Sequence, residues 1–314
     1  MQEQFLKLDS LPQAVKGCVL TIGNFDGVHV GHRRIIETAR KLADGGPVVA
    51  LTFDPPPDRI IRPADAPLRL TPHAVKCGLL VEAGCDYVVT ATATTEMLAL
   101  SPEAFAQRFI VETFAPRHMV EGPNFFFGRA RSGNIETLAE IGAREGFEVH
   151  VAEPVRIELP GGEELVSSTL IRGLVGQGRV AEAATCLGRP FALCGRVVRG
   201  YGRGRQLEYP TANLRLGDQV VPADGVYAGF AEIEGKRLRA AISVGTAPTF
   251  RTDTDSRRTV EAHLLSDVGD IYDRDIAVAF LQHLREQRRY DDLGALKAQM
   301  ARDVEQVRGM IKEK

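Results

Sequence analysis

Two hydrophobic periods alternate along the first half of the chain. Short continuous apolar runs are typical of buried strands, and stretches in which apolar residues recur every three to four positions are typical of helices. The runs that predict strands lie at residues 18–22, 47–53, 86–90, 118–121 and 147–152. Helices are expected between them, beginning near residues 31, 71, 101 and 134, and the last three start at a Thr, Ser or Asn that can cap a helix. The alternation predicts an α/β domain with a doubly wound parallel sheet.

The pattern changes near residue 186. Six short strand candidates follow with little helix between them, at residues 191–199, 211–215, 225–233, 236–244, 259–265 and 276–284. Strands of this kind suggest a small closed antiparallel barrel, because closure removes exposed sheet edges. A final helix over 293–311 has an apolar stripe, which we expect to pack on the barrel rather than to bind a partner. We therefore predict two domains, residues 1–185 and 186–314.

Composition narrows the class of protein. The chain has 314 residues, 44% of them hydrophobic and 25% charged, as in ordinary globular proteins, and a net charge of −2 makes no case for a nucleic-acid partner. The start is polar and no apolar run approaches the roughly 18 residues of a membrane span, so neither a signal peptide nor a membrane partner is expected. The five cysteines form no CxxC pair, which favours reduced thiols and a cytoplasmic protein. The oligomeric state is left open.

Residues 21–32, TIGNFDGVHVGH, lie where the first strand turns into the first helix. The amino end of a helix offers unpaired N–H groups and a positive dipole end, so it attracts phosphate. His29 and His32 could donate hydrogen bonds to phosphoryl oxygens there, and Gly31 would let a ligand come close to the backbone. Taken alone, the HVGH letters fit two surface histidines equally well.

Other irregular segments fall beyond the carboxyl ends of the predicted strands, where ligands collect in doubly wound sheets. They are residues 24–32, 54–57, 90–95, 122–133 and 167–169. In the glycine-bounded loop 122–133, Arg129 and Arg131 could contact phosphate, or its phenylalanines could simply plug the sheet edge. Ser and Thr at 167–169 are usually only helix caps, but Arg172 one turn later could reach a phosphate.

Three features of the second domain carry candidate chemistry. The segment 195–205 interleaves glycines with arginines and could wrap phosphates, although a solvated loop or an RNA-binding segment has the same composition. No Walker A sequence occurs in the chain. PTAN follows at 210–213, and VEAH at 260–263 places Glu261 on the strand face opposite Val260 and Ala262.

Taken together, these motifs resemble those of the bacterial bifunctional riboflavin kinase/FAD synthetases. GNFDGVHVGH, GPNFFFGRARSG and VSSTLIR match in the first domain, and PTAN and VEAH match in the second, in the family's order over nearly the whole chain. The resemblance implies a HIGH-type nucleotidylyltransferase domain at 1–185 that transfers AMP from ATP to FMN, giving FAD and pyrophosphate. It implies a riboflavin kinase domain at 186–314 that makes FMN from riboflavin with ATP and Mg²⁺, flavins being substrates and products.

The resemblance also implies roles for individual residues. In the first domain His29, His32 and Arg172 are catalytic. The implied ATP and phosphate contacts there are Gly23, Asn24, Phe25, Asp26, Gly31, Ser167, Ser168 and Thr169. The flavin-binding candidates are Asn124, Phe125, Phe127, Arg129 and Arg285. In the kinase domain Glu261 is the general base. The implied phosphate contacts there are Gly202, Arg203, Gly204, Arg205, Thr211 and Asn213, of which Thr211 and Asn213 also hold Mg²⁺.

Four positions depart from the family pattern. Pro56 stands in place of a histidine and Asn124 in place of an aspartate, both near the expected adenylyltransferase site. Glu208 replaces a glycine before PTAN, and Gln287 stands where glutamate is frequent. Two alternatives therefore stay open: a riboflavin kinase with a degenerate first domain, and a non-catalytic flavin- or nucleotide-binding protein. An adenylyltransferase of another pathway would leave the PTAN domain unexplained.

Overall fold

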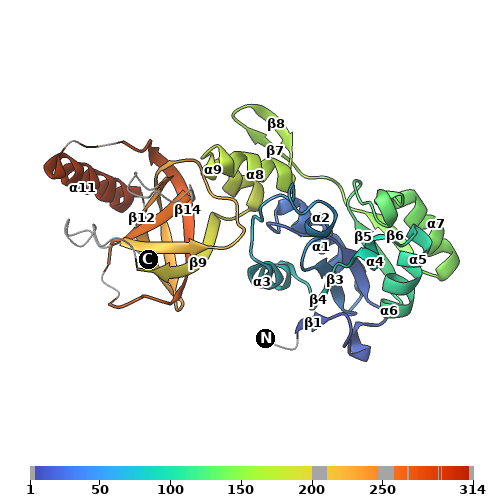
Figure 1. The fold of residues 1–314 in the computed structure, drawn as a ribbon. Coiled ribbons are helices and arrows are strands. Elements are labelled where there is room, and N and C mark those ends of the chain that lie inside the picture. The colour runs from blue at the N-terminus through green and yellow to red at the C-terminus, as the bar shows by residue number, and fades with distance from the viewer. Residues whose placement is uncertain are drawn as a thin grey trace. The chain divides into compact units, whose positions relative to one another are not determined.

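The chain folds into two compact units (Figure 1). A computed structural model describes residues 4–199, 211–246, 258–266, 269–288, 290 and 292–310. The first unit consists of Met1–Pro67 and His73–Ser167, and the second of Leu68–Pro72 and Ser168–Lys314. The predicted fold class is confirmed, because the first unit holds a parallel sheet and the second a closed antiparallel barrel.

The sheet of the first unit has six strands, all parallel to their neighbours. They are β1 (Phe5–Lys7), β2 (Val19–Ile22), β3 (Val48–Phe53), β4 (Tyr87–Ala91), β5 (His118–Glu121) and β6 (Glu148–Val151). Their order in the sheet is β1-β4-β3-β2-β5-β6. The chain moves outward from β2 through β3 and β4 and then returns to β5, so the switch point of the fold lies between β2 and β5.

Helices cover both faces of this sheet. The helices are α1 (Val30–Leu42), α2 (Pro57–Ile61), α3 (His73–Ala83), α4 (Thr95–Leu98), α5 (Pro102–Ala106), α6 (Glu112–Phe114) and α7 (Ile135–Glu145). Ile36 of α1 and Leu80 of α3 pack on one face, beside Val48 and Val88. Residues of α5 and α7 pack on the other face, which makes the sheet doubly wound as predicted.

Two local features differ from the predicted elements. The helix predicted to begin near residue 101 consists of α5, a π-helical segment η3 (Gln107–Val111) and α6. Strand β1 was not predicted, because it spans three residues in a polar stretch. It exists because it pairs with β4 at the sheet edge, where Leu6 packs against the core.

The second unit contains a closed six-stranded barrel. Its strands are β9 (Phe191–Val198), β10 (Thr211–Leu216), β11 (Gly225–Ile233), β12 (Lys236–Thr246), β13 (Arg258–Leu264) and β14 (Asp275–Arg285), in the order β10-β13-β12-β11-β14-β9. Helix α11 (Leu293–Met310) packs on the barrel as predicted, with Val304 and Val307 buried. Leu293, the first residue of the apolar stripe of α11, is exposed instead.

Two helices that precede the barrel belong to the second unit. These are α8 (Ser168–Gly176) and α9 (Val180–Leu187), of which α9 packs against β9 and β14. The compact units therefore divide after Ser167, earlier than the predicted boundary at 185, because the apolar face of α9 is buried on the barrel. A hairpin of β7 (Arg156–Leu159) and β8 (Gly162–Leu165) lies near the end of the first unit.

A short segment of the first half also joins the second unit. Leu68–Pro72 lies beside the segment that follows β10, where the backbone N–H of Arg69 donates to the carbonyl of Asp218 at 2.8 Å. The Arg69 guanidinium pairs with the Asp218 carboxylate at 3.0 Å. Arg69 and Asp218 are 149 positions apart in the sequence, so the hydrophobic pattern alone could not predict this connection.

Within the described residues no helix is both long and apolar enough to cross a membrane. All five cysteines lie in this part of the chain and are thiols. Burial raises the pKa of Cys18 and of Cys85 to about 12, so these two thiols stay protonated at neutral pH.

Candidate functional site

The amino-terminal candidate site forms around the turn that joins β2 to α1. In this turn Phe25, Gly27 and Val28 adopt left-handed backbone conformations, with φ of 48°, 85° and 40°. Such a conformation is rare for a β-branched residue and persists only where packing enforces it. Phe25 and Val28 are both buried in the core. The turn is therefore a rigid platform for the residues that follow it.

His29 and His32 lie with their rings stacked, the centroids 3.6 Å apart and the planes at 20°. His29 is the N-cap of α1, and its Nδ1 accepts a hydrogen bond from the backbone N–H of His32 at 3.4 Å. Because Nδ1 accepts, we assign the proton of the neutral His29 ring to Nε2. A β-carbon at Gly31 would come within 3.1 Å of the His29 ring, so any side chain there would crowd that ring.

The side chain of Phe25 supports this histidine pair from the core. It is only 3% exposed and meets the His32 ring edge-on, the centroids 5.3 Å apart. A β-carbon at Gly23 would lie 3.1 Å from the same phenyl ring. The contact of Phe25 with ATP stays a prediction, as do those of Asn24, which is exposed, and Asp26, which is half-buried.

A buried lysine that the sequence analysis missed anchors the turn. Lys76 of α3 is 5% exposed, and its Nζ donates to the carbonyl of Asn24 at 3.0 Å and to Thr52 Oγ1 at 2.9 Å. It thereby ties the turn after β2 to the end of β3. The sequence did contain a signal for this burial. Lys76 lies three and four positions before Leu79 and Leu80, so it shares a helix face with two residues that are buried.

Glu121, the last residue of β5, lies at the switch point of the sheet. β2 and β5 pair only through Val19–His118 and Leu20–Met119. After these two pairs, the backbone N–H of Ile22 donates to the side-chain carboxyl group of Glu121 at 2.7 Å instead of to a backbone carbonyl of β5. Burial raises the pKa of Glu121 well above its ordinary value, which favours the uncharged form of this side chain.

The loop 122–133 leaves the same edge of the sheet. Phe127 and Gly133 exchange two backbone hydrogen bonds of 3.0 Å, which close the loop. Phe127 lies in the core at 6% exposure, so this ring does plug the sheet edge, and Phe125 stacks on it with the centroids 5.5 Å apart. The Arg131 guanidinium covers the exposed ring of Phe126 at 4.6 Å.

The other residues predicted for the first site divide between the two units. Asn124 and Arg129 are exposed at the surface of the loop, and Phe125 is half-buried. Ser167 ends the first unit, whereas Ser168, Thr169 and Arg172 belong to α8 in the second. The Arg172 Nε donates to the carbonyl of Leu68 at 2.8 Å, which joins α8 to the segment Leu68–Pro72.

The carboxyl-terminal candidate site lies on the outer face of the barrel. Strand β13 lies between β10 and β12, and its Glu261 is paired with Asn213 of β10 and with Ser243 of β12. Val260 and Ala262 point inward and are buried, so Glu261 points outward as the alternation predicted. The Thr211 hydroxyl donates to the Glu261 carboxylate at 3.4 Å. Barrel closure therefore brings together the PTAN and VEAH residues.

Gln287 contacts strand β12 next to Ser243, the residue that is paired with Glu261. Its side-chain amide donates to Ser243 Oγ at 2.7 Å and to the carbonyl of Val244 at 3.2 Å. A glutamate at this position could not donate either bond at neutral pH. The departure from the family pattern thus adds a contact between the segment after β14 and β12.

Arg285 is engaged in an ion pair in this structure. Its guanidinium makes a bidentate contact with Asp303 of α11, with Nη2 2.7 Å from Oδ2 and Nε 3.0 Å from Oδ1. The Asp303 side chain is only 5% exposed, and Gln299 also donates to it. The pair raises the pKa of Arg285 and joins α11 to β14. A flavin contact by Arg285 stays a prediction.

The glycine- and arginine-rich segment 195–205 begins inside β9, which ends at Val198. Residues 200–210 lie outside the described residues, and they include Gly202, Arg203, Gly204, Arg205 and Glu208. Their predicted phosphate contacts are therefore still expectations from the sequence.

Two family models match the chain in succession. The FAD synthetase model matches residues 11–170, and the riboflavin kinase model matches residues 187–311. Both domains are thus present in the order that the motifs predicted.

Similar proteins match along nearly the full length. A bifunctional riboflavin kinase/FMN adenylyltransferase of Pseudomonas fluorescens is 37% identical over 305 residues, which cover 96% of each chain. The protein with that name from Escherichia coli K12 is 37% identical over 303 residues, 94% of this chain and 93% of its own. A solved structure titled macrolide-efflux protein, from Streptococcus pneumoniae, superposes with a TM-score of 0.86 at 29% identity, covering 97% of this chain and 99% of its own.

Proposed function

Because this chain belongs to the bifunctional riboflavin kinase/FMN adenylyltransferase family, we propose that it converts riboflavin to FMN and FMN to FAD, using ATP in both steps. We place AMP transfer to FMN in residues 1–185 and riboflavin phosphorylation in residues 186–314. The observation that carries the proposal is the juxtaposition of Thr211 with Glu261 on the barrel, since it unites two motifs in one arrangement suited to phosphoryl transfer.

In the kinase reaction Glu261 is the general base. A primary hydroxyl is a weak nucleophile, so a carboxylate that takes the proton of the riboflavin 5′-hydroxyl favours its attack on the γ-phosphorus of ATP. The hydroxyl of Thr211 donates to this carboxylate and orients it. ADP leaves as the new phosphate ester forms.

Thr211 and Asn213 fit Mg²⁺ delivered with ATP. While the Thr211 hydroxyl donates its single proton to Glu261, its oxygen lone pairs can still accept a cation, and the Asn213 side chain offers an amide oxygen on the same strand face. Such neutral oxygen ligands suit Mg²⁺, which keeps several of its waters. Bound there, Mg²⁺ would neutralise charge on the ATP phosphates.

In the adenylyltransferase reaction a phosphate oxygen of FMN attacks the α-phosphorus of ATP, and pyrophosphate leaves. No covalent enzyme intermediate is required, so the residues act by positioning and by electrostatic stabilisation. The stacked imidazoles of His29 and His32 stand at the amino end of α1, where the backbone already favours negative charge. We assign them to the triphosphate and the departing pyrophosphate.

Two alternatives make different predictions. A kinase with an inactive first domain would fit Pro56 and Asn124, and a flavin- or nucleotide-binding protein would show no turnover. The experiment is to incubate the purified chain with MgATP and either riboflavin or FMN, then separate the flavins by chromatography. We expect FMN and FAD from riboflavin, and FAD from FMN. FMN as the sole product would support the first alternative, and no product would support the second.

The proposal also concerns location and partners. Five thiols without a disulfide favour a reducing compartment, so we place both reactions in the cytoplasm. Riboflavin, FMN and ATP are the proposed small-molecule substrates. Neither a nucleic acid nor a membrane is needed for the chemistry.

A further inference from the structure

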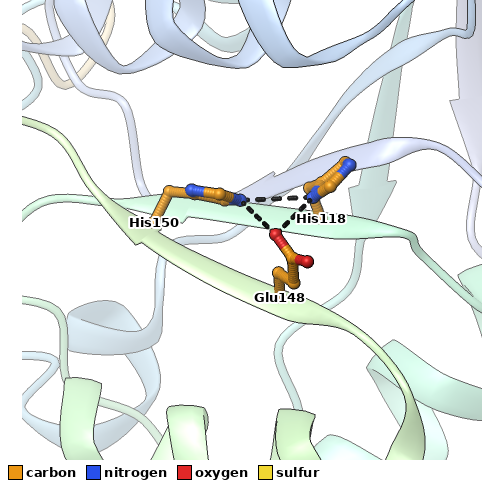
Figure 2. Close-up of side chains that lie close together, drawn as sticks. All are labelled: His118, Glu148 and His150. Carbon is orange, nitrogen blue, oxygen red and sulfur yellow. Dashed lines mark hydrogen bonds and ion pairs between the residues drawn. The ribbon is translucent and has the colours of Figure 1, made fainter.

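Three potential metal ligands lie together on β5 and β6, and none of them is among the residues of the two candidate sites. Register pairs His118 with Glu148, and His150 follows Glu148 by two positions on β6. Since residues two apart on a strand share a face, all three side chains project from one face of the sheet. Figure 2 shows their polar ends converging above the two strands. His118 and Glu148 begin their strands, so the cluster lies near the amino ends of β5 and β6, whereas the turn with His29 and His32 follows the carboxyl end of β2.

The distances within the cluster match a metal coordination shell. His118 Nδ1 lies 3.2 Å from His150 Nε2. The Glu148 Oε2 atom lies 3.6 Å from His118 Nδ1 and 3.5 Å from His150 Nε2. Ligands bound to zinc at about 2.0–2.1 Å in tetrahedral geometry are about 3.3–3.4 Å from one another. One ion could therefore contact all three atoms without rearrangement of the strands.

The chemistry of the donors selects the class of ion. Two imidazole nitrogens and one carboxylate oxygen are the donor set of zinc sites that keep one position for water. Magnesium and calcium prefer oxygen ligands throughout, so this cluster disfavours them. The side chains of His118 and His150 are 25% and 29% exposed, whereas Glu148 is 73% exposed. An ion can thus reach the cluster from solvent.

We propose that His118, Glu148 and His150 bind one zinc-type divalent ion. Among the described strands β6 is the last of the sheet and pairs with β5 alone, so an ion bound by side chains of both strands would stabilise this edge of the sheet. The proposal is independent of the flavin chemistry. The alternative is that the cluster binds no ion and that its two imidazoles and its carboxylate only hydrogen-bond to one another.

Titration with zinc distinguishes these two possibilities. The full chain, without a histidine tag, is treated with chelator, dialysed and titrated with Zn²⁺ in a calorimeter. We expect one ion per chain and at least a tenfold loss of affinity in Glu148→Gln and in His150→Gln, since each removes a ligand or its charge. Cobalt(II) in place of zinc should give the visible absorption of a four-coordinate site, and both variants should lose it.

His283→Gln is the matched control. His283 and Glu286 form another surface histidine–glutamate pair, 3.8 Å apart, outside the three-ligand cluster. This variant should bind zinc like the parent. Zinc should also raise the thermal midpoint of the parent and of His283→Gln but not that of Glu148→Gln, whose exposed position makes the substitution harmless to folding.

The proposal is overturned if the parent binds no zinc stoichiometrically, or if Glu148→Gln and His150→Gln bind it within a factor of two of the parent. Either result would assign the cluster to hydrogen bonding alone.

Discussion

The hydroxyl of Thr211 lies 3.4 Å from the carboxylate of Glu261, although 50 positions separate the two residues in the sequence. The contact exists because β10 and β13 are neighbours in the barrel, with Asn213 directly opposite Glu261. A carboxylate, a hydroxyl and an amide thus share one outward face. Such a cluster can accept a proton and bind a cation within the reach of one substrate.

Replacing Glu261 with glutamine tests the proposed base. The amide keeps the shape of the side chain but removes its basicity, so kcat for riboflavin phosphorylation should fall by about 10²- to 10⁴-fold. The KM for riboflavin should change little, because the loss is confined to the transition state. The measurement is the steady-state rate of FMN formation. A variant with nearly the parent rate would make Glu261 an ordinary surface glutamate of the barrel.

Substitutions of Thr211 and Asn213, the proposed ligands of Mg²⁺, should have a different effect from Glu261→Gln. Thr211→Val and Asn213→Ala should raise the MgATP requirement as well as slow turnover, while Thr211→Ser, which keeps the hydroxyl, should stay close to the parent. FAD formation from supplied FMN should survive in all of these variants.

Replacing the histidine pair tests the first candidate site. His29 caps α1, so alanine there would also cost about 1 kcal/mol of helix stability. His29→Asn combined with His32→Ala avoids this complication, because asparagine can cap the helix. FAD formation should fall by about 10²- to 10³-fold for each lost donor. Riboflavin phosphorylation serves as the internal control, and an equal loss of both activities would contradict the two-site assignment.

The buried acid Glu121 should make stability depend on pH. Its folded-state pKa is raised by burial, so above about pH 4.3 the unfolded chain releases a proton that the folded chain retains. The stability associated with this group is complete below that pH and is lost as pH rises through the folded-state pKa, by about 1.4 kcal/mol per pH unit within this window.

Glu121→Gln removes this titration and keeps an oxygen to accept the Ile22 N–H. The variant should therefore gain stability relative to the parent as pH rises from about 4.3, a typical glutamate pKa, and show a constant difference below it. Denaturant unfolding of both proteins at several pH values measures this. A difference that does not vary with pH would mean that the folded-state pKa of Glu121 is ordinary.

The ion pair of Arg285 with Asp303 should stabilise the second unit. Asp303→Ala leaves the guanidinium without its buried partner, and we expect the free energy of unfolding to fall by about 3 kcal/mol, near the lower end for a broken buried pair. Arg308→Ala on the same helix is the control, since its pair with Glu305 is exposed and should be worth less than about 1 kcal/mol. Equal effects of the two substitutions would contradict this assignment.

The packing of α9 predicts how the second unit can be isolated. A fragment of residues 168–314 retains α8 and α9, whereas a fragment of 183–314 loses α8 and the buried Val180. The longer fragment should unfold at a higher temperature and convert riboflavin to FMN. Thermal unfolding and FMN formation measure the two properties. A longer fragment that is folded but inactive as a kinase would contradict the proposed division of labour.

Sequence alone determined the local structure. Apolar runs and cap residues predicted the strands and helices of the sheet because burial imposes a period on each element separately. Glu261 could be placed on the outer face of its strand for the same reason, since neighbouring side chains alternate. The family was also identifiable from sequence, because TIGNFDGVHVGH, PTAN and VEAH are contiguous and need no knowledge of contacts.

Only the tertiary structure decided which distant groups meet. Strand order and register brought Thr211 to Glu261, and Glu148 to His118, because the pairing of strands depends on the arrangement of the whole sheet or barrel. The buried roles of Lys76 and Glu121 were hidden for a related reason. A charged residue in a sequence is usually exposed, and only the packing around it reveals that its polar atoms satisfy backbone groups in the core.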